Sequence, residues 1–426
     1  MLGCIGGRLR LGSAQWRENG SAPGTSDRRR PVVLFQWRQS APYHVDRVDA
    51  VNEAGITDLD IVHVCDTPSS DEFPFRPSAS RAVITHTLRK DGKFEETSTL
   101  GRLRRRLALL RRYDVRYAFL CHHELLDTFV AALVMRLLGT RVYLMLSSKF
   151  DDKPRWHWRE LLKSFSLLPY HGALVGGRRQ RDYAVFLGMR PEHVLEGYET
   201  ISVARIRALA GAPPAPGGLP FADRHFTIVA RHVAKKNLFM ALDAYERYRQ
   251  HAGAAARELH FCGSGPLEAA LKAEVERRRI PGVLFTGFVS QRRVARALSG
   301  TLALLLPSTE EQWGLVINEA LAMGVPVLCA DNVGARDSLV RSTVNGQFFE
   351  PDNAEGLATL MAELGGDEAE WRRMSEAACQ FAPAGDVIVF ARAVARLLSH
   401  DRPEAVRAPR FDVSPPRPLA EPGADR

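Results

Sequence analysis

The chain has 426 residues, of which 45% are apolar, and its formal net charge is +9. This length predicts two or three domains with substantial cores, and the positive charge favours an anionic partner: a phosphate ester, an anionic membrane surface or nucleic acid. No run of 18 apolar residues occurs, and the N-terminus lacks the apolar stretch of a signal peptide. We therefore expect neither a membrane-spanning nor a secreted protein.

The six cysteines, at positions 4, 65, 121, 262, 329 and 379, include no Cys-x-x-Cys pair. Four of them lie in strand-like apolar runs such as Val327-Leu328-Cys329. This distribution is typical of buried thiols in a reducing compartment. We therefore expect a cytoplasmic protein.

Residues 1–30 are rich in Gly, Ser and Arg and have neither helical nor strand periodicity, so they predict a disordered lead-in. From Pro31 onward, short apolar runs alternate with segments of helical spacing. The runs lie at residues 32–37, 61–65, 82–85, 117–121, 142–146 and 173–175. Strands that alternate with helices indicate a parallel sheet covered on both faces. We therefore predict an N-terminal α/β domain over residues 31–205.

The segment Leu100–Arg112 predicts a basic amphipathic helix. Leucines at 100, 103, 107 and 110 share one face, and arginines at 102, 104, 105, 106, 111 and 112 occupy the rest. The simpler interpretation is that the leucines face the core and the arginines are solvated. The alternative is a peripheral contact of Arg102–Arg112 with anionic lipid, where each arginine contributes on the order of 1 kcal/mol. No aromatic residues alternate with these charges, so we do not expect nucleic acid binding.

Three polar residues, His122, His123 and Glu124, follow the strand-like run of residues 117–121. Open α/β sheets bind ligands at the carboxyl ends of their strands, so these side chains are candidate ligand contacts. A hydrogen-bonded structural histidine explains the pattern equally well. Adjacent histidines without a third ligand at a suitable spacing do not predict a zinc site.

Residues 206–224 are rich in proline and glycine and predict an interdomain linker. A second domain is expected over residues 225–385. Its first strand ends at Arg231, and Lys236 opens the next helix. Because these two cations flank one strand-to-helix turn, they can bind one pyrophosphate, Arg through its planar fork and Lys as a point charge. Solvated surface charge is the alternative interpretation.

Two further segments of this domain suggest ligand contacts. The strand Leu259–Cys262 leads into a tight turn that contains Gly263 and Gly265. The stretch Pro307–Ala330 predicts a buried strand, a short loop, a helix that opens at Gly314 and a further buried strand. Free N–H groups and the helix dipole make such a helix start an anion site.

Glu311 and Glu319, eight positions apart, place one carboxylate at the start of this helix and the other inside it. A carboxylate beside a phosphate site is best explained as an acceptor for ligand hydroxyl groups. An N-terminal capping acid and one solvated glutamate form the alternative interpretation.

The same stretch resembles the motif of the retaining glycosyltransferases of the GT-B fold, family-4 type. The matching residues are Pro307-Ser308-x-x-Glu311, then Gly314-Leu315-Val316, then Glu319-Ala320-Leu321-Ala322-x-Gly324-x-Pro326-Val327. The resemblance is strong over residues 226–360 and loose before them. It implies an α/β fold of two Rossmann-like, doubly wound domains facing a cleft. Beyond them we expect a terminal helix over residues 386–400 that packs back toward the N-terminal domain, and a disordered tail over residues 401–426.

The resemblance also implies roles for individual residues. His123 and Glu311 are expected to be catalytic, with His122 as an off-by-one alternative to His123. The expected donor-binding residues are Arg231, Lys236, Gly263, Gly265, Gly314, Leu315 and Glu319. Among these, Glu319 is expected to hold the ribose hydroxyls of the donor.

The predicted reaction is transfer of a sugar from a nucleoside diphosphate sugar to a carbohydrate or lipid-linked hydroxyl acceptor, with retention at the anomeric carbon. No metal or other cofactor is expected, because the two cations and the helix start can stabilise the departing diphosphate. Two alternatives stay open: a nucleotide-sugar epimerase on the same fold, and a non-catalytic nucleotide-sugar-binding protein.

Overall fold

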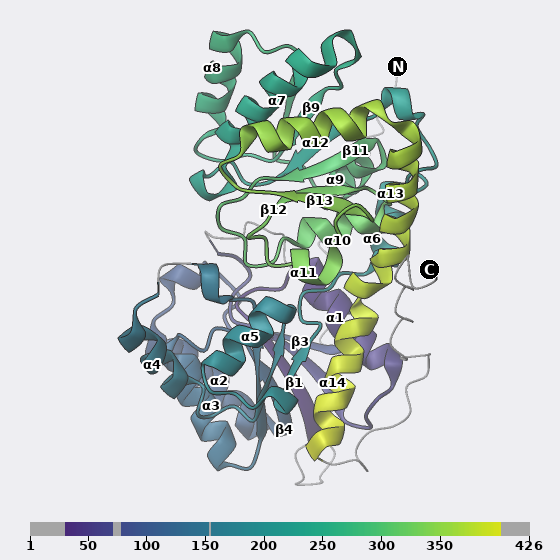
Figure 1. The fold of residues 1–426 in the computed structure, drawn as a ribbon. Coiled ribbons are helices and arrows are strands. Elements are labelled where there is room, and N and C mark those ends of the chain that lie inside the picture. Colours follow the sequence, from purple (N-terminus) through teal and green to yellow (C-terminus); the bar gives the residue numbers. More distant parts are fainter. Residues whose placement is uncertain (1–29, 71–77, 153–154, 402–426) are drawn as a thin grey trace, which may run out of the picture.

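The computed structural model describes residues 30–70, 78–152 and 155–401, which form two α/β units with α14 along the first (Figure 1). The predicted disordered lead-in and tail therefore lie outside the described residues, apart from Arg30 and Asp401. Each unit is built on a parallel sheet with helices on both faces. The prediction of two doubly wound domains is thus confirmed.

The first sheet has seven parallel strands in the order β3-β2-β1-β4-β5-β6-β7. Its strands are β1 Arg30–Trp37, β2 Asp60–Cys65, β3 Ile84–Thr87, β4 Tyr113–Leu120, β5 Arg141–Leu146, β6 Gly172–Val175 and β7 Val194–Glu196. Its helices are α1 Pro42–Ala54, α2 Thr99–Arg112, α3 Leu126–Leu137, α4 His157–Ser166 and α5 Arg178–Phe186. The three-residue strand β7 was not predicted.

The apolar runs of the first sheet supply both of its cores, because successive strand side chains point to opposite faces. Val33 and Phe35 of β1 pack in one buried cluster, with α1 and the C-terminal helix α14 (Val387–Asp401). Val32 and Leu34 pack in the other, with side chains of α2, α3 and α5. The sheet is therefore covered on both faces.

The second sheet has six parallel strands in the order β10-β9-β8-β11-β12-β13. They are β8 His225–Val229, β9 Leu259–Cys262, β10 Val283–Gly287, β11 Thr301–Leu306, β12 Val327–Ala330 and β13 Gly346–Phe349. The helices of this part are α6 Val203–Ala210, α7 Leu238–Ala252, α8 Glu268–Arg278, α9 Gln291–Ser299, α10 Leu315–Ala322, α11 Arg336–Leu339, α12 Ala354–Gly366 and α13 Glu368–Phe381.

The boundary between the two units differs from the predicted linker. Residues 206–210 belong to helix α6, and Ile206 and Ala210 are buried in the core of the second unit. Ala215 is buried there too, and its N–H donates to the carbonyl of Met323 at 2.8 Å. The proline-rich segment is thus partly an integral element of the second unit.

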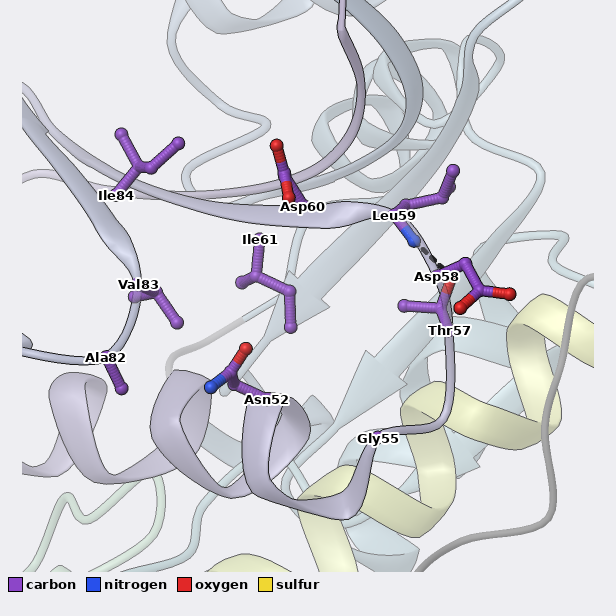
Figure 2. Close-up of a pocket in the computed structure, with 10 residues that line it drawn as sticks. All are labelled: Asn52, Gly55, Thr57, Asp58, Leu59, Asp60, Ile61, Ala82, Val83 and Ile84. Carbon is purple, nitrogen blue, oxygen red and sulfur yellow. Dashed lines mark hydrogen bonds between the residues drawn. The ribbon is translucent and has the colours of Figure 1, made fainter. Parts of the chain in front are cut away.

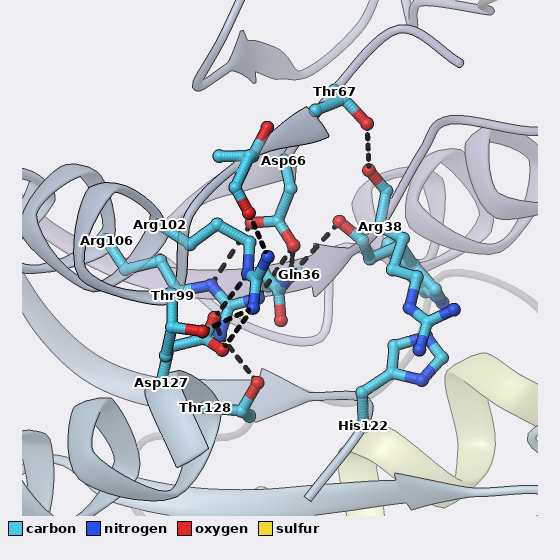
Figure 3. A network of polar contacts seen from close by, with 12 residues as sticks. Gln36, Arg38, Asp66, Thr67, Thr99, Arg102, Arg106, His122, Asp127 and Thr128 are labelled. Carbon is cyan, nitrogen blue, oxygen red and sulfur yellow. Dashed lines mark hydrogen bonds and ion pairs between the residues drawn. The ribbon is translucent and has the colours of Figure 1, made fainter. Parts of the chain in front are cut away.

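Helix α2 forms where the basic amphipathic helix is predicted, but its arginines are not all solvated. Arg106 is only 2% exposed and binds Asp66 through two nitrogens, at 3.1 and 2.6 Å. Arg102 binds Asp127 in the same way, at 3.0 and 2.9 Å (Figure 3). The proposed lipid contact through Arg102–Arg112 is therefore wrong for these two residues, because both side chains point inward. In the described part of the chain no helix is both long and apolar enough to cross a bilayer.

Candidate active site

The order of the second sheet defines where its ligand edge lies. From β8 the chain adds β9 and β10 on one side, and it then adds β11, β12 and β13 on the other side. Such a reversal leaves a crevice at the carboxyl ends of the two central strands, here β8 and β11. The loop that follows β8 carries Arg231 and Lys236, and the loop that follows β11 carries Glu311.

Lys236 and Glu311 meet across this crevice. The ammonium of Lys236 contacts Oε2 of Glu311, and the hydroxyl of Ser308 donates to the same oxygen at 3.1 Å. The backbone holds the two loops together, because the N–H of Thr309 donates to the carbonyl of Lys235 at 2.9 Å. The side chains of Lys236 and Glu311 are 14% and 15% exposed, so this ion pair is largely shielded from solvent.

The glycine turn after β9 lies directly against the loop that carries Arg231. A Cβ atom on Gly263 would lie 1.9 Å from the carbonyl oxygen of Ala230, and one on Gly265 would lie 2.6 Å from that of His232. Gly263 also has a φ of +143°. Glycine is thus required for this close backbone approach, which places the turn beside the exposed Arg231.

Helix α10 begins at this edge with a glycine N-cap. Gly314 has a φ of +98°, and it is followed by Leu315, the first residue of the helix. Because glycine has no side-chain oxygen to cap the first turn, that turn offers its N–H groups to a ligand. The positive end of the α10 dipole therefore lies beside the Lys236–Glu311 pair.

Glu319 lies further along α10 in a chain of polar contacts that sequence reasoning did not find. Its Oε1 accepts from Gln291 at 3.2 Å, and Oε1 of Gln291 accepts from Arg205 at 2.6 Å. Arg205 in turn binds Asp46 of α1 at 2.8 Å. Burial raises the pKa of Glu319 above its ordinary value, while the hydrogen bond from Gln291 and the charge of Arg205 act in the opposite direction.

Asn318, next to Glu319, was also missed. It is 2% exposed, and its amide nitrogen donates to the carbonyls of Glu199 and Gly385, each at 3.1 Å. Its Oδ1 accepts from the indole of Trp313 at 3.0 Å. A polar residue among the buried apolar positions of α10 was the available signal, because buried amides require partners.

The first sheet has its own reversal, between β1 and β4. Here the loops carry Arg38 and residues 122–124. Glu124 Oε1 accepts from His122 at 3.1 Å and lies 3.8 Å from Arg38, and Figure 3 shows Arg38 and His122 in this region. Burial alone would raise the pKa of Glu124, but the hydrogen bond from His122 outweighs this effect and holds the pKa at about 2.

The two histidines differ in accessibility. The side chain of His122 is 32% exposed, and its backbone is left-handed with a φ of +63°. That of His123 is 8% exposed, and burial lowers its pKa, so the ring is neutral at pH 7. The role expected for His123 stays a prediction, and the geometry makes His122 the more accessible of the two.

The carboxyl edges of the two sheets face each other. The Trp313 ring packs on the turn after β6, where a Cβ on Gly176 or Gly177 would lie 2.9 Å from it. Gln312 donates to the hydroxyl of Ser148, after β5, at 3.4 Å. The loop after β11 and the loops after β5 and β6 therefore lie in one region between the units.

A hollow of ≈ 420 Å³ lies elsewhere, between the end of α1 and the start of β2. Asn52, Gly55, Thr57 and Asp60 are among its lining residues (Figure 2). Because this loop precedes β2, the hollow lies at the amino edge of the sheet, opposite the edge where such sheets bind ligands. We therefore do not include it in the candidate site.

Comparison with known proteins points to the same part of the chain. Residues 216–381 match the family model described as Glycosyl transferases group 1. The O-antigen chain mannosyltransferase C of Escherichia coli is 26% identical over 157 residues, 36% of this chain and 40% of that protein. A putative teichuronic acid biosynthesis glycosyltransferase of Bacillus subtilis (strain 168) is 32% identical over 141 residues, 33% of each protein. This chain therefore spans less than half of the length of these two relatives.

Among solved structures, that of Anabaena Alr3699/HepE in complex with UDP has a TM-score of 0.64 to this structure at 14% identity. The likeness covers 87% of this chain and 100% of that one. At this level of identity, the comparison shows the fold alone.

Proposed function

We propose that this protein is a retaining glycosyltransferase with a nucleoside diphosphate sugar as donor. The match of residues 216–381 to the model described as Glycosyl transferases group 1 and the likeness of the fold to a solved structure support this proposal. The observation that carries the proposal is the contact between Lys236 and Glu311 at the β8–β11 crevice. It brings a cation and a carboxylate, from segments far apart in the sequence, to the start of α10. A phosphate and a sugar hydroxyl can bind there side by side.

The reaction breaks the bond between the anomeric carbon and a β-phosphate oxygen, the oxygen of the acceptor hydroxyl forms the new bond to that carbon, and the hydroxyl proton leaves with the nucleoside diphosphate. Negative charge grows on the departing diphosphate. Arg231, Lys236 and the first turn of α10 stabilise that charge, and such preorganised groups often make the largest contribution to catalysis. Because Lys236 is already held by Glu311, its ammonium is positioned before the donor arrives.

The two glutamates have different tasks in this proposal. Glu311 accepts a hydrogen bond from a hydroxyl of the transferred sugar and thereby orients that sugar. Its contact with Lys236 places the sugar beside the cation that binds the diphosphate. Glu319 accepts hydrogen bonds from the ribose hydroxyls of the donor. Gly263 and Gly265 let the backbone approach the nucleotide closely, and the loops after β1 and β4 face the sugar from the other unit.

We further propose that the acceptor belongs to polysaccharide or glycolipid synthesis, as the names of the two relatives indicate for those proteins. The cations and the helix start neutralise the diphosphate, so we propose that no metal is required. Activity unchanged by EDTA is the expected result, and its loss would contradict this part. The free, mostly buried thiols among the described residues favour the cytoplasm.

The test is turnover by the full chain with a panel of nucleoside diphosphate sugars and glycan acceptors, followed by NMR of the product. We expect transfer with the anomeric configuration of the donor retained. Glu311→Gln should lower kcat/KM by about 100-fold, because it removes a charged contact at the reacting sugar. The matched control is Glu310→Gln, since Glu310 is an exposed acid in the same loop.

The products also decide between the alternatives. An epimerised nucleotide sugar without transfer would indicate the isomerase. Tight donor binding without any turnover would indicate the non-catalytic protein. Equal losses in Glu311→Gln and Glu310→Gln would contradict the role of Glu311.

A further inference from the structure

Helix α4 exposes its apolar side and not its polar side. Trp158, Leu161, Leu162 and Phe165 follow the i, i+3, i+4, i+7 spacing of one helix face. They are 56%, 59%, 58% and 55% exposed, respectively. A surface helix of a monomeric protein normally buries such a stripe, so an exposed one indicates an interaction site.

Polar contacts on the inner side fix this orientation of α4. Glu160 is 6% exposed and accepts from the hydroxyl of Tyr183 at 2.6 Å and from Lys163 at 2.9 Å. Arg155 adds a contact to Glu160 at 3.3 Å and one to Tyr183 at 3.0 Å. Rotating the apolar stripe inward would break this buried network, so the stripe is held toward the exterior.

The exposed apolar surface continues beyond α4. Phe150, before α4, and Phe186, at the end of α5, are 49% and 57% exposed, and their ring centroids lie 5.2 Å apart. Leu168, two residues after α4, is 66% exposed. We call these residues together with the α4 stripe the apolar face: Phe150, Trp158, Leu161, Leu162, Phe165, Leu168 and Phe186.

The surroundings of the apolar face are basic. From Phe150 to Phe186, the two ends of the apolar face in the sequence, there are seven Lys or Arg residues and four acids, so the segment carries a net positive charge. Arg155 and Lys163 are paired with Glu160, and Arg179 is paired with Asp151 and Asp337. The exposed Arg159 lies 5.1 Å above the ring of Trp158 and 5.8 Å above that of Trp156. Aromatic, leucine and arginine side chains in this combination are typical of helices that lie in a membrane interface.

We propose that the apolar face docks this protein onto the surface of an anionic lipid bilayer. Its apolar side chains enter the boundary of the acyl chains, and the basic residues around it contact the head groups. Charge complementarity favours this partner over a second copy of the chain, because two identical faces would bring their cations together. The surface is distinct from α2, whose Arg102 and Arg106 point inward.

The placement of α4 links this surface to the edge between the two units. The segment that joins β5 to α4 begins with Ser147 and Ser148, and Ser148 accepts from Gln312 beside Glu311. A docked bilayer would therefore lie next to the loop after β5, which contacts the loop that carries Glu311. The docking itself requires only the apolar face and goes beyond the proposed function.

The test is flotation of the full chain with vesicles of phosphatidylcholine, alone or with phosphatidylglycerol. We expect binding to the vesicles that contain phosphatidylglycerol, weakened by salt and by Arg159→Gln. Leu161→Ser with Leu162→Ser should lower the partition coefficient by about tenfold or more, because two leucines no longer enter the bilayer. The matched control is Leu100→Ser with Leu219→Ser, at leucines that are 55% and 45% exposed elsewhere.

The outcomes separate docking from folding and from catalysis. The α4 variant should keep the wild-type melting temperature and donor binding, because its leucines face the exterior. The proposal is overturned if the wild-type chain ignores both kinds of vesicle, or if the control variant loses as much binding. It is also overturned if sedimentation shows a dimer that the α4 variant splits while vesicle binding stays unchanged.

Discussion

At the scale of single residues, Glu319 illustrates a conflict between stability and function. It is half-buried on α10, between the buried residues Asn318 and Ala320, and this burial raises the pKa of its carboxyl group. A carboxyl group whose pKa is higher in the folded than in the unfolded state stabilises the fold when it is protonated. That stabilisation is lost as the pH rises from the unfolded value, near 4.5, through the folded one.

Replacing Glu319 by Gln should therefore raise the free energy of unfolding at pH 7. The gain should vanish below the unfolded pKa, where both side chains are neutral. The same change should weaken donor binding by about tenfold or more, because a charged acceptor for the ribose hydroxyls is lost. Thermal unfolding between pH 4 and 8 checks the first effect and calorimetric titration the second. A variant that is less stable than wild type at pH 7 would contradict this account.

The two histidines after β4 give a second residue-scale prediction. His122 is accessible and His123 is buried, so His122→Ala should lower kcat with an unchanged melting temperature. His123→Ala should instead lower the melting temperature, because it leaves a cavity beside Glu124. Parallel assays of kcat and melting temperature on both variants decide the matter. Loss of kcat in His123→Ala at unchanged stability would contradict this division and support the catalytic role predicted for His123.

At the scale of elements, helix α2 is anchored by charge. Arg106 forms ion pairs with Asp66, which follows β2, and with Asp127 of α3. Its Nη1 also donates a hydrogen bond to the hydroxyl of Thr128 at 2.5 Å. Burial lowers the pKa of Arg106, but the two carboxylates outweigh this effect and raise it. The guanidinium therefore stays charged and joins three segments of the first unit.

Arg106→Gln should cost about 3–5 kcal/mol of stability, because it leaves the buried carboxylate of Asp66 without its cation, while Asp127 keeps Arg102. Arg105→Gln, one position away on the exposed side of α2, should change stability by less than about 0.5 kcal/mol. Urea denaturation of both variants checks this. Similar small effects in both would show that the network contributes nothing to stability.

Helices α2 and α4 also show how far the sequence can predict this structure. Apolar runs and helical spacing located most strands and helices, because those patterns are local. They could not tell that Arg106 points inward or that the leucines of α4 point outward, because the orientation of a helix depends on partners far away in the sequence. For Arg106 these partners are Asp66 and Asp127, and for Glu160 the partner is Tyr183.

The candidate site shows the same division. The motif from Pro307 to Val327 indicated Glu311, Glu319 and Gly314, since their spacing is continuous along the chain. The sequence did not indicate that Lys236 would contact Glu311, 75 positions away. Nor did it indicate the hydrogen bonds that connect Glu319 to Gln291 and Gln291 to Arg205, because these three residues lie on separate helices.

At the scale of the whole molecule, the two units are joined twice. The chain crosses between the units near Ile201 and again near Asp386. Backbone hydrogen bonds join these two segments: the N–H of Ile201 donates to the carbonyl of Gly385 at 3.1 Å, and the N–H of Val387 donates to the carbonyl of Ile201 at 3.0 Å. Asn318 binds both segments. The helix that carries Glu319 is therefore fixed to the crossing point.

Helix α14 completes the first unit from the C-terminal side of the chain. Phe390 is fully buried there, and its ring lies 5.8 Å from that of Phe35 in β1. Phe390→Ala should cost about 3–5 kcal/mol through the cavity that it leaves. In scanning calorimetry this loss should lower the transition of the first unit while donor binding by the second persists. The control is the exposed Arg396→Ala on the same helix, and equal shifts in both would contradict the packing role of α14.

The central claim, a donor site at the β8–β11 crevice, is tested most directly by calorimetric titration with UDP-, GDP-, ADP- and dTDP-sugars. Wild-type protein should bind one nucleotide class. Arg231→Ala, Glu319→Ala and Lys236→Gln should each weaken that binding by about tenfold or more, whereas Lys235→Gln, the exposed neighbour, should not. Binding of none of these donors by the wild-type chain, or equal binding by all four variants, would contradict the assignment.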